Sequence, residues 1–453
     1  MKKLIFSLFA VIVVVFLIVS LSVTGCKKTT TAVETNAIAT TVSEEMTTAA
    51  EEPTTAAEEP ITILWWDWQA NVNLGKDVVD KLVEEFKKTH PNVTVKRKEF
   101  SYGDYNTALK TALASGEGPD VFEVHPGAPS SDLAQAGQLM DLTEIIKGDA
   151  EWSEWIAPAL KLKDMYINGK IYYVPMDVNH LPLNYWKPMF EERNLKPPTT
   201  IAELYEVADV FKAEGIQPIA TGFKDQWAMI DIFTVLVRTK DTTGDLIDRA
   251  NIGQASWEDP LFKEAIQTIV DLKNKGVIPA NVLEISPWPE GIDMFVKKEA
   301  AMFWPCGQYG LASLPKDALA NDEIWDIPFP RLDENGKSLY TGGASITMAI
   351  NSATKHHEII IELMKLMNSP FGQEVVFDSM RTPPGNLVTK KSSVELFNRQ
   401  TYDQNNTEIG YRYIDNPDIY KEVAVGIQSA LIGGNIDSIL ANIEAVSKEV
   451  NKK

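Results

Sequence analysis

From residue 61 onward the chain alternates short apolar runs with amphipathic stretches. Residues 61–66 form a short, mostly apolar run typical of a buried strand, and residues 78–86 carry apolar side chains at helical spacing that must end before Pro91. The same alternation predicts a second strand at 92–96, a second helix at 105–113 and a third strand at 119–124. Strands separated by helices of this length pair in parallel, so the pattern predicts an α/β fold whose ligands bind outside the carboxyl ends of the strands.

The middle and the end of the chain repeat this scheme. Thr200 followed by Glu203 forms a capping box, which predicts a helix running to Lys212. Further predicted elements are strands at 217–222, 300–304 and 327–330 and helices at 259–275, 291–297, 354–367, 372–379 and 436–450. The sequence contains no Gly-x-Ser-x-Gly, P-loop, Gly-x-Gly-x-x-Gly or His-Glu-x-x-His motif, so no common catalytic fingerprint points to an enzyme.

The first 26 residues carry a targeting signal. Lys2 and Lys3 precede an uncharged apolar run at 4–23, which is the layout of a secretory signal, although the run is also long enough for a retained transmembrane helix. Val23-Thr24-Gly25-Cys26 resembles the lipobox of bacterial lipoproteins. This resemblance implies a signal peptide at 1–25, acyl chains such as palmitate on Cys26, and a position on the outer face of the cytoplasmic membrane, because two acyl chains anchor a protein stably.

Residues 26–60 are expected to form a tether. Residues 27–60 contain no aromatic side chain, and the heptapeptide at 47–53 repeats at once at 54–60 as Thr-Thr-Ala-Ala-Glu-Glu-Pro. Such a segment buries too little apolar surface to offset the entropy lost on ordering, and its threonines and prolines argue against a helix.

Composition narrows the possible function classes. A length of 453 residues suggests two domains, and 43 basic against 63 acidic residues give a net charge of −20. The absence of a basic block argues against a nucleic-acid partner. The chain has two cysteines, too few for a disulfide scaffold. Its five histidines lack the i, i+4 spacing of metal ligands, so neither a metal site nor a cofactor is expected.

Four motifs in order resemble those of bacterial extracellular solute-binding proteins of the sugar-transporter type, the maltose-binding-protein-like family. They are Ser115–Val124, Asn168–Pro175 followed by Leu183–Lys187, Phe295–Met302 with Gly307–Tyr309, and the pair Gly342-Gly343. The chain departs from the pattern at Trp186, where Asn is usual, and at Tyr309, where Trp is common.

The resemblance implies a type II periplasmic-binding-protein-like fold of two α/β lobes that close over a ligand by a hinge. Chain crossings are expected near 175–178, 326–328 and 382–385, which assigns 61–176 plus 328–382 to lobe 1 and 177–327 plus 383–453 to lobe 2. It further implies a monomeric, non-enzymatic receptor that captures a sugar or oligosaccharide and delivers it to the permease of an ABC importer.

Sugars present apolar C–H faces and a rim of hydroxyl groups, so a sugar site combines aromatic side chains with amide, carboxylate or guanidinium groups. The aromatic candidates are Trp66, Trp227, Trp288, Trp304 and Tyr309. Tyr309 matches the stacking position implied by the resemblance, and Trp66 is preferred over Trp68 at the end of the first strand. Trp227 and Trp288 are expected in loops. Core packing is the alternative for Trp66 and Trp304.

The polar candidates are Asp67, Asp120, Asn179, Gly343 and Arg381. Asp120 matches the aspartate of the Pro-Asp motif, with capping of local N–H groups as the alternative. Asn179 follows the first crossing, where the resemblance implies a sugar-binding polar side chain. Gly343 allows a close backbone approach or a tight turn, and Arg381 offers a hydrogen-bonding fork or a salt bridge between lobes. His125 is expected to be a solvated loop residue.

Three other functions remain open. A receptor for a polyamine or an organic acid is the nearest, because Asp67, Asp120 and Asp177 could surround a cation. A lipid-anchored glycosidase would use a pair of carboxylates, nominally Asp67 and Asp120. A surface adhesin would bind a macromolecule on an outer face and show no closure around small ligands.

Overall fold

The computed structural model describes residues 59–68, 74–307, 310, 313–380, 409–411 and 413–452. The predicted signal peptide, the predicted lipid attachment site Cys26 and the predicted tether up to residue 58 lie outside the described residues, as do Tyr309 and Arg381.

The first large sheet has five strands in the order β2-β1-β3-β11-β4. These strands are β1 (Ile61–Asp67), β2 (Val93–Glu99), β3 (Val121–Val124), β4 (Tyr173–Pro175) and β11 (Thr347–Ile350). β1 pairs in parallel with β2 and β3, as the strand and helix alternation predicts, and β11 pairs antiparallel to β3 and β4. The two predicted helices are present as α1 (Leu74–Phe86) and α2 (Tyr102–Ser115).

Helices packed against this sheet complete a first hydrophobic core. They include α3 (Ala128–Gln135), α4 (Thr143–Gly148), α5 (Ala150–Trp155), α13 (His357–Asn368) and α14 (Pro370–Met380). Trp65 and Ile63 point into this core from β1, whereas Leu64 on the opposite face of the strand is exposed. One face of β1 therefore carries the core and the other face meets solvent.

The second large sheet has four strands in the order β7-β8-β6-β9. These are β6 (Leu183–Trp186), β7 (Gln217–Ala220), β8 (Ala300–Phe303) and β9 (Ile324–Ile327). Thr200 and Glu203 form the predicted capping box at the start of α7 (Ile201–Ala213). The remaining helices of this part are α6 (Lys187–Glu191), α9 (Leu246–Asn251), α10 (Pro260–Asn274), α11 (Ile292–Val296), α12 (Lys316–Ala320), α16 (Pro417–Leu431) and α17 (Ile436–Val450).

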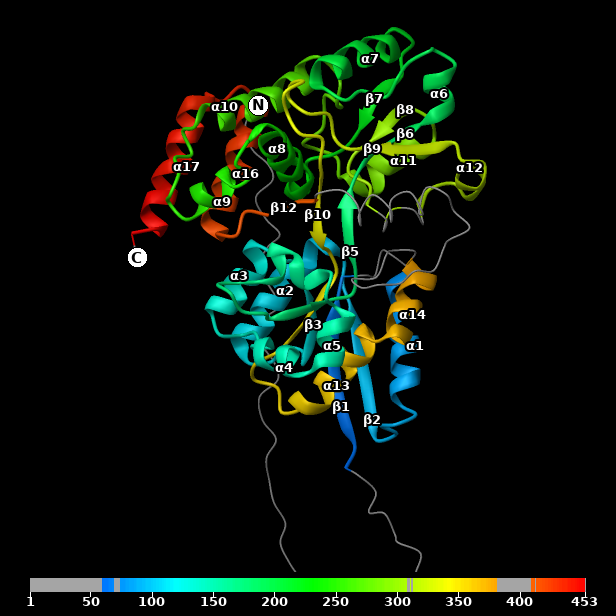
Figure 1. Cartoon of the computed structure of the whole chain (residues 1–453), viewed down its shortest axis with the longest axis vertical. Helices are drawn as coiled ribbons and strands as arrows, with labels where there is room; N and C mark the ends of the chain where they lie inside the picture. Colours follow the sequence, from blue (N-terminus) through cyan, green and yellow to red (C-terminus); the bar gives the residue numbers. More distant parts are fainter. Residues whose placement is uncertain are drawn as a thin grey trace, which may run out of the picture. The chain divides into compact units, whose positions relative to one another are not determined.

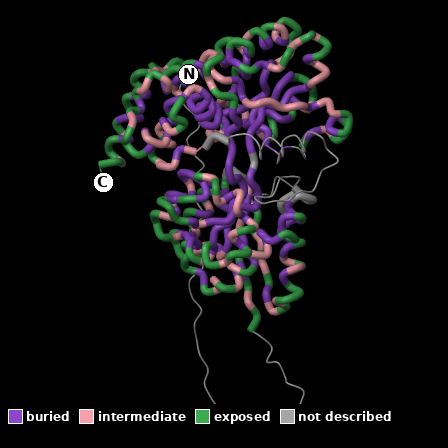
Figure 2. The backbone as a smooth tube through the Cα atoms, in the orientation of Figure 1, coloured by how far each residue is buried: buried purple, intermediate pink, exposed green. Residues whose placement is uncertain are grey.

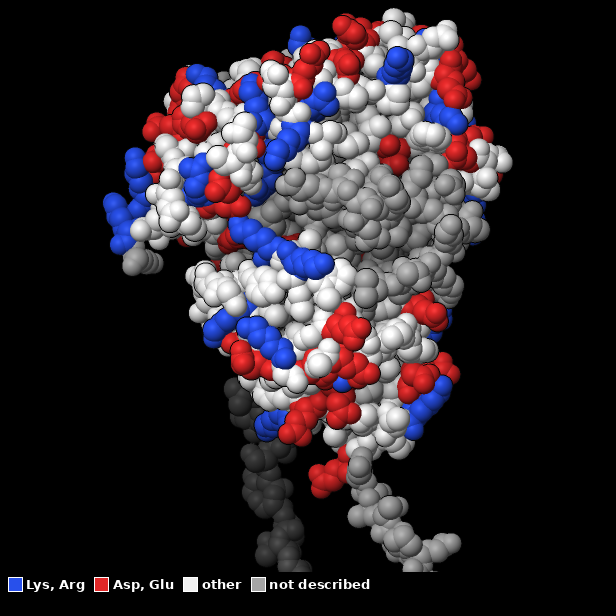
Figure 3. Space-filling view, viewed as in Figure 1, with Lys and Arg blue, Asp and Glu red and all other residues white. Residues whose placement is uncertain are grey.

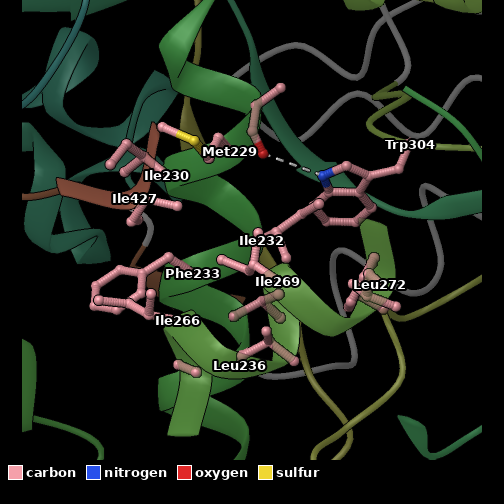
Figure 4. Close-up of a cluster of buried hydrophobic side chains, with 14 of the residues drawn as sticks. Met229, Ile230, Ile232, Phe233, Leu236, Ile266, Ile269, Leu272, Trp304 and Ile427 are labelled. Atoms are coloured by element: carbon pink, nitrogen blue, oxygen red, sulfur yellow. Dashed lines mark hydrogen bonds between the residues drawn. The ribbon is translucent and has the colours of Figure 1, made fainter. Parts of the chain in front are cut away.

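Helix α8 (Gln226–Lys240) lies at the centre of a second core. Figure 4 shows its side chains Met229, Ile232 and Phe233 among those of α10 and Ile427 of α16. The sequence analysis does not predict α8 because twelve of its fifteen residues are buried, so no polar face marks the helical period. Trp227 accordingly sits in the first turn of α8 rather than in a loop.

A small sheet of order β12-β10-β5 joins the two larger ones. β5 (Val178–Leu181) lies between β4 and β6 in the chain, and β10 (Tyr340–Ala344) leads into β11. β10 pairs antiparallel to β5 and parallel to β12 (Ile409–Tyr411). Figure 1 shows β5 and β10 side by side between the two larger sheets. Three separate passages of the chain thus share one sheet.

The second strand of the small sheet along the chain, β10, lies later than the crossing expected at 326–328. Asp326 and Ile327 belong to β9, and Phe329 and Leu339 are buried in the second core. Phe329 packs edge-on against Trp304 with ring centroids 4.8 Å apart. Phe329 and Leu339 thus belong to the second core, and the chain enters the small sheet after them, at β10.

Buried residues follow β3, β4, β6, β8, β10, β11 and α8 (Figure 2). Over the described ranges, no helix combines the length and the apolar character that a bilayer crossing requires.

Candidate functional site

The carboxyl ends of β1 and β3 meet at one edge of the five-stranded sheet, because the two strands are parallel neighbours. Trp68 directly follows β1 and His125 directly follows β3. Their rings lie 4.4 Å apart, and Trp68 also meets Tyr105 of α2 edge-on at 5.0 Å. We call Trp68, Tyr105, Glu123 and His125 the edge cluster. It gathers aromatic rings where ligands bind in sheets of this kind.

Hydrogen bonds to the last residues of β3 hold the edge cluster in place. The Trp68 backbone N–H donates to Oε2 of the fully buried Glu123 at 3.2 Å, and the Tyr105 hydroxyl donates to the Glu123 carbonyl at 2.6 Å. Burial, together with the nearby Glu123 carboxylate, raises the pKa of Tyr105 well above its usual value. The phenol therefore remains a hydrogen-bond donor at neutral pH, and the rings are fixed relative to both strands.

Asp67 is engaged within the sheet. Arg97 of β2 donates to both oxygens of its carboxylate, at 2.6 and 3.0 Å, and the Trp65 indole N–H donates to Oδ2 at 3.0 Å. Asp67 is 2% exposed, and Arg97 also pairs with Glu99 at 2.6 Å. These bonds give Asp67 a role in holding β1 to β2, and a ligand would have to compete with Arg97 for its oxygens.

Asp120 lies at the opposite edge of the sheet, just before β3 begins. Its carboxylate accepts a bond from the Leu64 backbone N–H at 2.8 Å and another from the Thr354 hydroxyl. The observed bonds favour the alternative in which Asp120 satisfies backbone N–H groups. The nominal carboxylate pair of Asp67 and Asp120 thus lies at two different ends of the strands.

Trp66 belongs to a chain of aromatic contacts that begins beside α2. Its ring lies 4.8 Å from that of Phe100, and the Lys98 ammonium lies 4.5 Å from its centroid. Phe100 in turn meets Tyr105 at 5.6 Å. Trp66 therefore connects to the edge cluster through Phe100 and Tyr105, but its own half-buried ring lines a groove beside α2.

The tryptophan candidates of the second core differ in exposure. Trp304 is fully buried, and its indole N–H donates to the Ala228 carbonyl of α8 at 3.4 Å (Figure 4). This environment favours the core-packing alternative. Trp288 is half-buried in a kinked turn at Pro287–Gly291 and meets Phe303 edge-on at 5.4 Å. Trp227 is half-buried as well.

Gly343 and Asn179 face each other across the small sheet as paired residues of β10 and β5. Gly343 has φ +142°, and a Cβ atom there would lie 2.0 Å from Oδ2 of Asp164. The same oxygen accepts the Ala344 backbone N–H at 2.7 Å. The close approach that glycine permits is therefore made by the Asp164 carboxylate of this chain.

Trp68 and His125 of the edge cluster are not among the predicted site residues, because the sequence pattern favours Trp66 over Trp68 and a solvated loop for His125. The useful signal is that parallel strands of an α/β sheet end at the same edge, so the residues that follow β1 and β3 can meet there.

The surface around these elements carries both charges. On the face drawn in Figure 3, acidic and basic side chains are interspersed over the described surface. Within the described ranges, no group of three or more His, Cys, Asp or Glu side chains is arranged to hold a metal ion.

Comparison with known proteins identifies relatives. The family model for bacterial extracellular solute-binding protein matches residues 73–374. The chain is 26% identical over 234 residues to an uncharacterised ABC transporter extracellular-binding protein of Pyrococcus horikoshii, a match that covers 50% of this chain and 51% of that protein. It is 24% identical to the multiple sugar-binding protein of Streptococcus mutans, with 67% of this chain and 70% of that protein covered.

A solved structure described as a chitin oligosaccharide binding protein shares the fold. Its TM-score is 0.77 at 21% identity, with 87% of this chain and all of that chain covered. The expected α/β fold of the type II periplasmic-binding-protein class is thereby confirmed.

Proposed function

The chain belongs to the family of bacterial extracellular solute-binding proteins, and from this premise we propose that it binds a sugar or oligosaccharide and delivers it to the permease of an ABC importer. The family consists of binding proteins, so the bound solute is carried and not converted.

The edge cluster is the observation that carries this proposal. Trp68, with 8% of its surface exposed, and the half-buried His125 are the rings of the cluster that can meet an apolar C–H face, and their contact at 4.4 Å fixes them relative to each other. The buried Glu123 and Tyr105 beneath them hold the rings before a ligand arrives, which lowers the entropy cost of binding. The name of the Streptococcus mutans relative, multiple sugar-binding protein, supports a sugar as the ligand.

The two hydrophobic cores correspond in this proposal to two lobes. With the packing of Phe329 and Leu339 taken into account, lobe 1 comprises about 61–176 and 345–380, and lobe 2 comprises about 183–339 and 413–453. The small sheet of β5, β10 and β12 forms the hinge. A sugar that touches both lobes stabilises their closed arrangement and shifts the population toward it.

Some sequence candidates keep a ligand-binding role in this proposal. Tyr309 and Arg381 are assigned to the ligand from their positions in the sequence, and Asn179 is assigned from its place in β5. Trp288 and Trp227 are secondary stacking candidates on lobe 2. Asp67, Asp120, Trp304 and Gly343 have structural contacts that account for them without a ligand, whereas Trp66 lines the groove beside α2.

Anchoring by lipid on Cys26 completes the proposal, with cleavage after Gly25 and a tether up to residue 60. The protein then works as a monomer on the outer face of the cytoplasmic membrane. Mass spectrometry of the intact membrane-extracted protein tests this part, because a diacylated Cys26 adds the mass of its acyl chains to a chain that begins at residue 26.

The sugar proposal is tested by identifying the small molecule that co-purifies with the native protein. A thermal-shift panel then compares raffinose, chitobiose and xylobiose with polyamines and organic acids, because a ligand that binds only the native state raises the melting midpoint. A midpoint raised by a polyamine or an organic acid alone would refute a sugar ligand. Release of a cleaved glycoside would revive the glycosidase alternative.

A further inference from the structure

A groove of about 620 Å³ runs along helix α2 on the outer face of the five-stranded sheet. Its lining comprises Trp66, Asp104, Thr107, Ala108, Thr111, Ala112, Ser115 and Glu117. Asp104 lies in the first turn of α2, and Glu117 follows the end of the helix. The groove therefore extends along the whole helix, which is roughly 20 Å long at 1.5 Å per residue.

The groove lies on a face of the sheet that packing leaves open. Leu64 is 39% exposed, and Trp66 on the same face of β1 is half-buried. Their partners in β2, Lys96 and Lys98, are exposed too. The Lys98 ammonium, 4.5 Å from the Trp66 centroid, restrains the ring, so a large aromatic surface is kept near solvent in a defined position.

The chemistry of the lining fits a neutral sugar chain. Trp66 supplies an aromatic surface for C–H faces, Thr107, Thr111 and Ser115 supply hydroxyl groups, and Asp104 and Glu117 supply carboxylates that accept bonds from sugar hydroxyls. No basic side chain is among the lining residues, so the groove disfavours an anionic polymer.

One end of the groove lies beside the edge cluster, because Asp104 lines the groove and the next residue, Tyr105, packs against Trp68. Aromatic contacts lead from Trp66 to Phe100 at 4.8 Å, to Tyr105 at 5.6 Å, to Trp68 at 5.0 Å and to His125 at 4.4 Å. A chain of sugar units bound at the edge cluster can thus extend toward Trp66 and continue along α2.

We infer that the groove along α2 is an extended subsite for a neutral glycan chain, so that the preferred ligand is an oligosaccharide longer than the edge cluster alone can hold. This inference rests on the proposed sugar-binding function. It requires that affinity increase with the number of sugar units, and that the increase depend on the groove.

Binding of matched oligosaccharide series of two to six units, from xylan, chitin and raffinose-type sugars, tests the inference by calorimetry. For the series that binds, the wild-type affinity should increase with length. Thr111→Arg, which places a long side chain into the groove from an exposed helix position, should lower the affinity for the longest member roughly 3- to 10-fold, as expected for one lost aromatic contact. It should leave the shortest member unaffected.

Asn442→Arg is the matched control, because it adds the same charge at an exposed position of α17. Trp66→Ala should act like Thr111→Arg, provided that circular dichroism shows an intact fold. An equal length dependence in wild type and Thr111→Arg overturns the extended subsite. The extended subsite is also overturned if the wild type binds cationic peptides in place of glycans and Thr111→Arg abolishes this binding. If no sugar of any length binds, the proposed function fails as a whole, whereas binding without length dependence refutes only the groove.

Discussion

Trp68 and Trp304 occupy equivalent positions in two sheets, yet their surroundings differ. Each directly follows a strand that pairs in parallel with a neighbour, β1 in one sheet and β8 in the other. Trp68 contacts the half-buried His125 and Tyr105, whose hydroxyl donates to the Glu123 carbonyl, whereas Trp304 is fully buried beside α8 and Phe329. A place at a strand end therefore does not by itself put a side chain at a ligand site. Whether such a side chain can reach a ligand depends on the element that covers the strand end.

Trp304→Ala should produce the largest effect on stability. Removing a fully buried indole leaves a cavity in the second core, and the free energy of unfolding should fall by about 3–5 kcal/mol. Urea denaturation measures this change. Folded protein should bind sugar with unchanged affinity, and a selective loss of affinity would return Trp304 to the ligand site.

Arg97→Met should separate the structural role of Asp67 from a ligand role. The variant leaves the buried Asp67 carboxylate without its main partner, so the free energy of unfolding should fall by about 3 kcal/mol. Lys96→Met, on the exposed face of the same strand, is the control for loss of one charge. Unchanged stability of Arg97→Met would contradict the assignment of Asp67 to the sheet.

Trp68→Ala should affect ligand affinity more than stability, the opposite of what we expect for Trp304→Ala. We expect the affinity for the identified sugar to fall roughly tenfold, equivalent to about 1.4 kcal/mol, with a smaller loss of stability than in Trp304→Ala. Calorimetric titration measures the affinity. Trp155→Ala serves as control, because Trp155 is a half-buried tryptophan of α5 with a Lys365 contact. Wild-type affinity in Trp68→Ala would remove the edge cluster from the site.

His125→Ala should give the smallest effect. The imidazole contributes one ring contact to Trp68, so the affinity should fall about 2- to 5-fold, in line with 0.5–1 kcal/mol for such a pair. His125→Phe keeps a ring at this position and should retain more affinity than His125→Ala. If both variants bind alike, the ring contact has no role in binding.

The sequence predicts the regular elements better than the site. Residues 61–66 show a mostly apolar run and Thr200 carries a capping box, so strand and helix are encoded locally. The role of Asp120 depends instead on Leu64 and Thr354, which are 56 and 234 residues distant in the chain. Likewise, the contact with Trp304 places Phe329 in the second core, before the chain enters β10. No local sequence pattern predicts such a contact.

The preference for Trp66 over Trp68 failed to anticipate the edge cluster for a related reason. Periodicity tells which face of a strand a side chain occupies, but not which helix lies above that face. Tyr105 of α2 reaches back to the Glu123 carbonyl and thereby creates the place where Trp68 packs. Tertiary contacts of this kind determine a binding site.

The small sheet has a mechanical consequence. Three strands from separate stretches of the chain are cross-linked by backbone hydrogen bonds, so bending one of them transmits torque to the other two. In the hinge proposed above, such coupling should favour rotation of the lobes about one axis over sliding of the strands. The permease of the proposed function would then meet two conformations of the protein, one with ligand and one without, and not a continuous range of conformations.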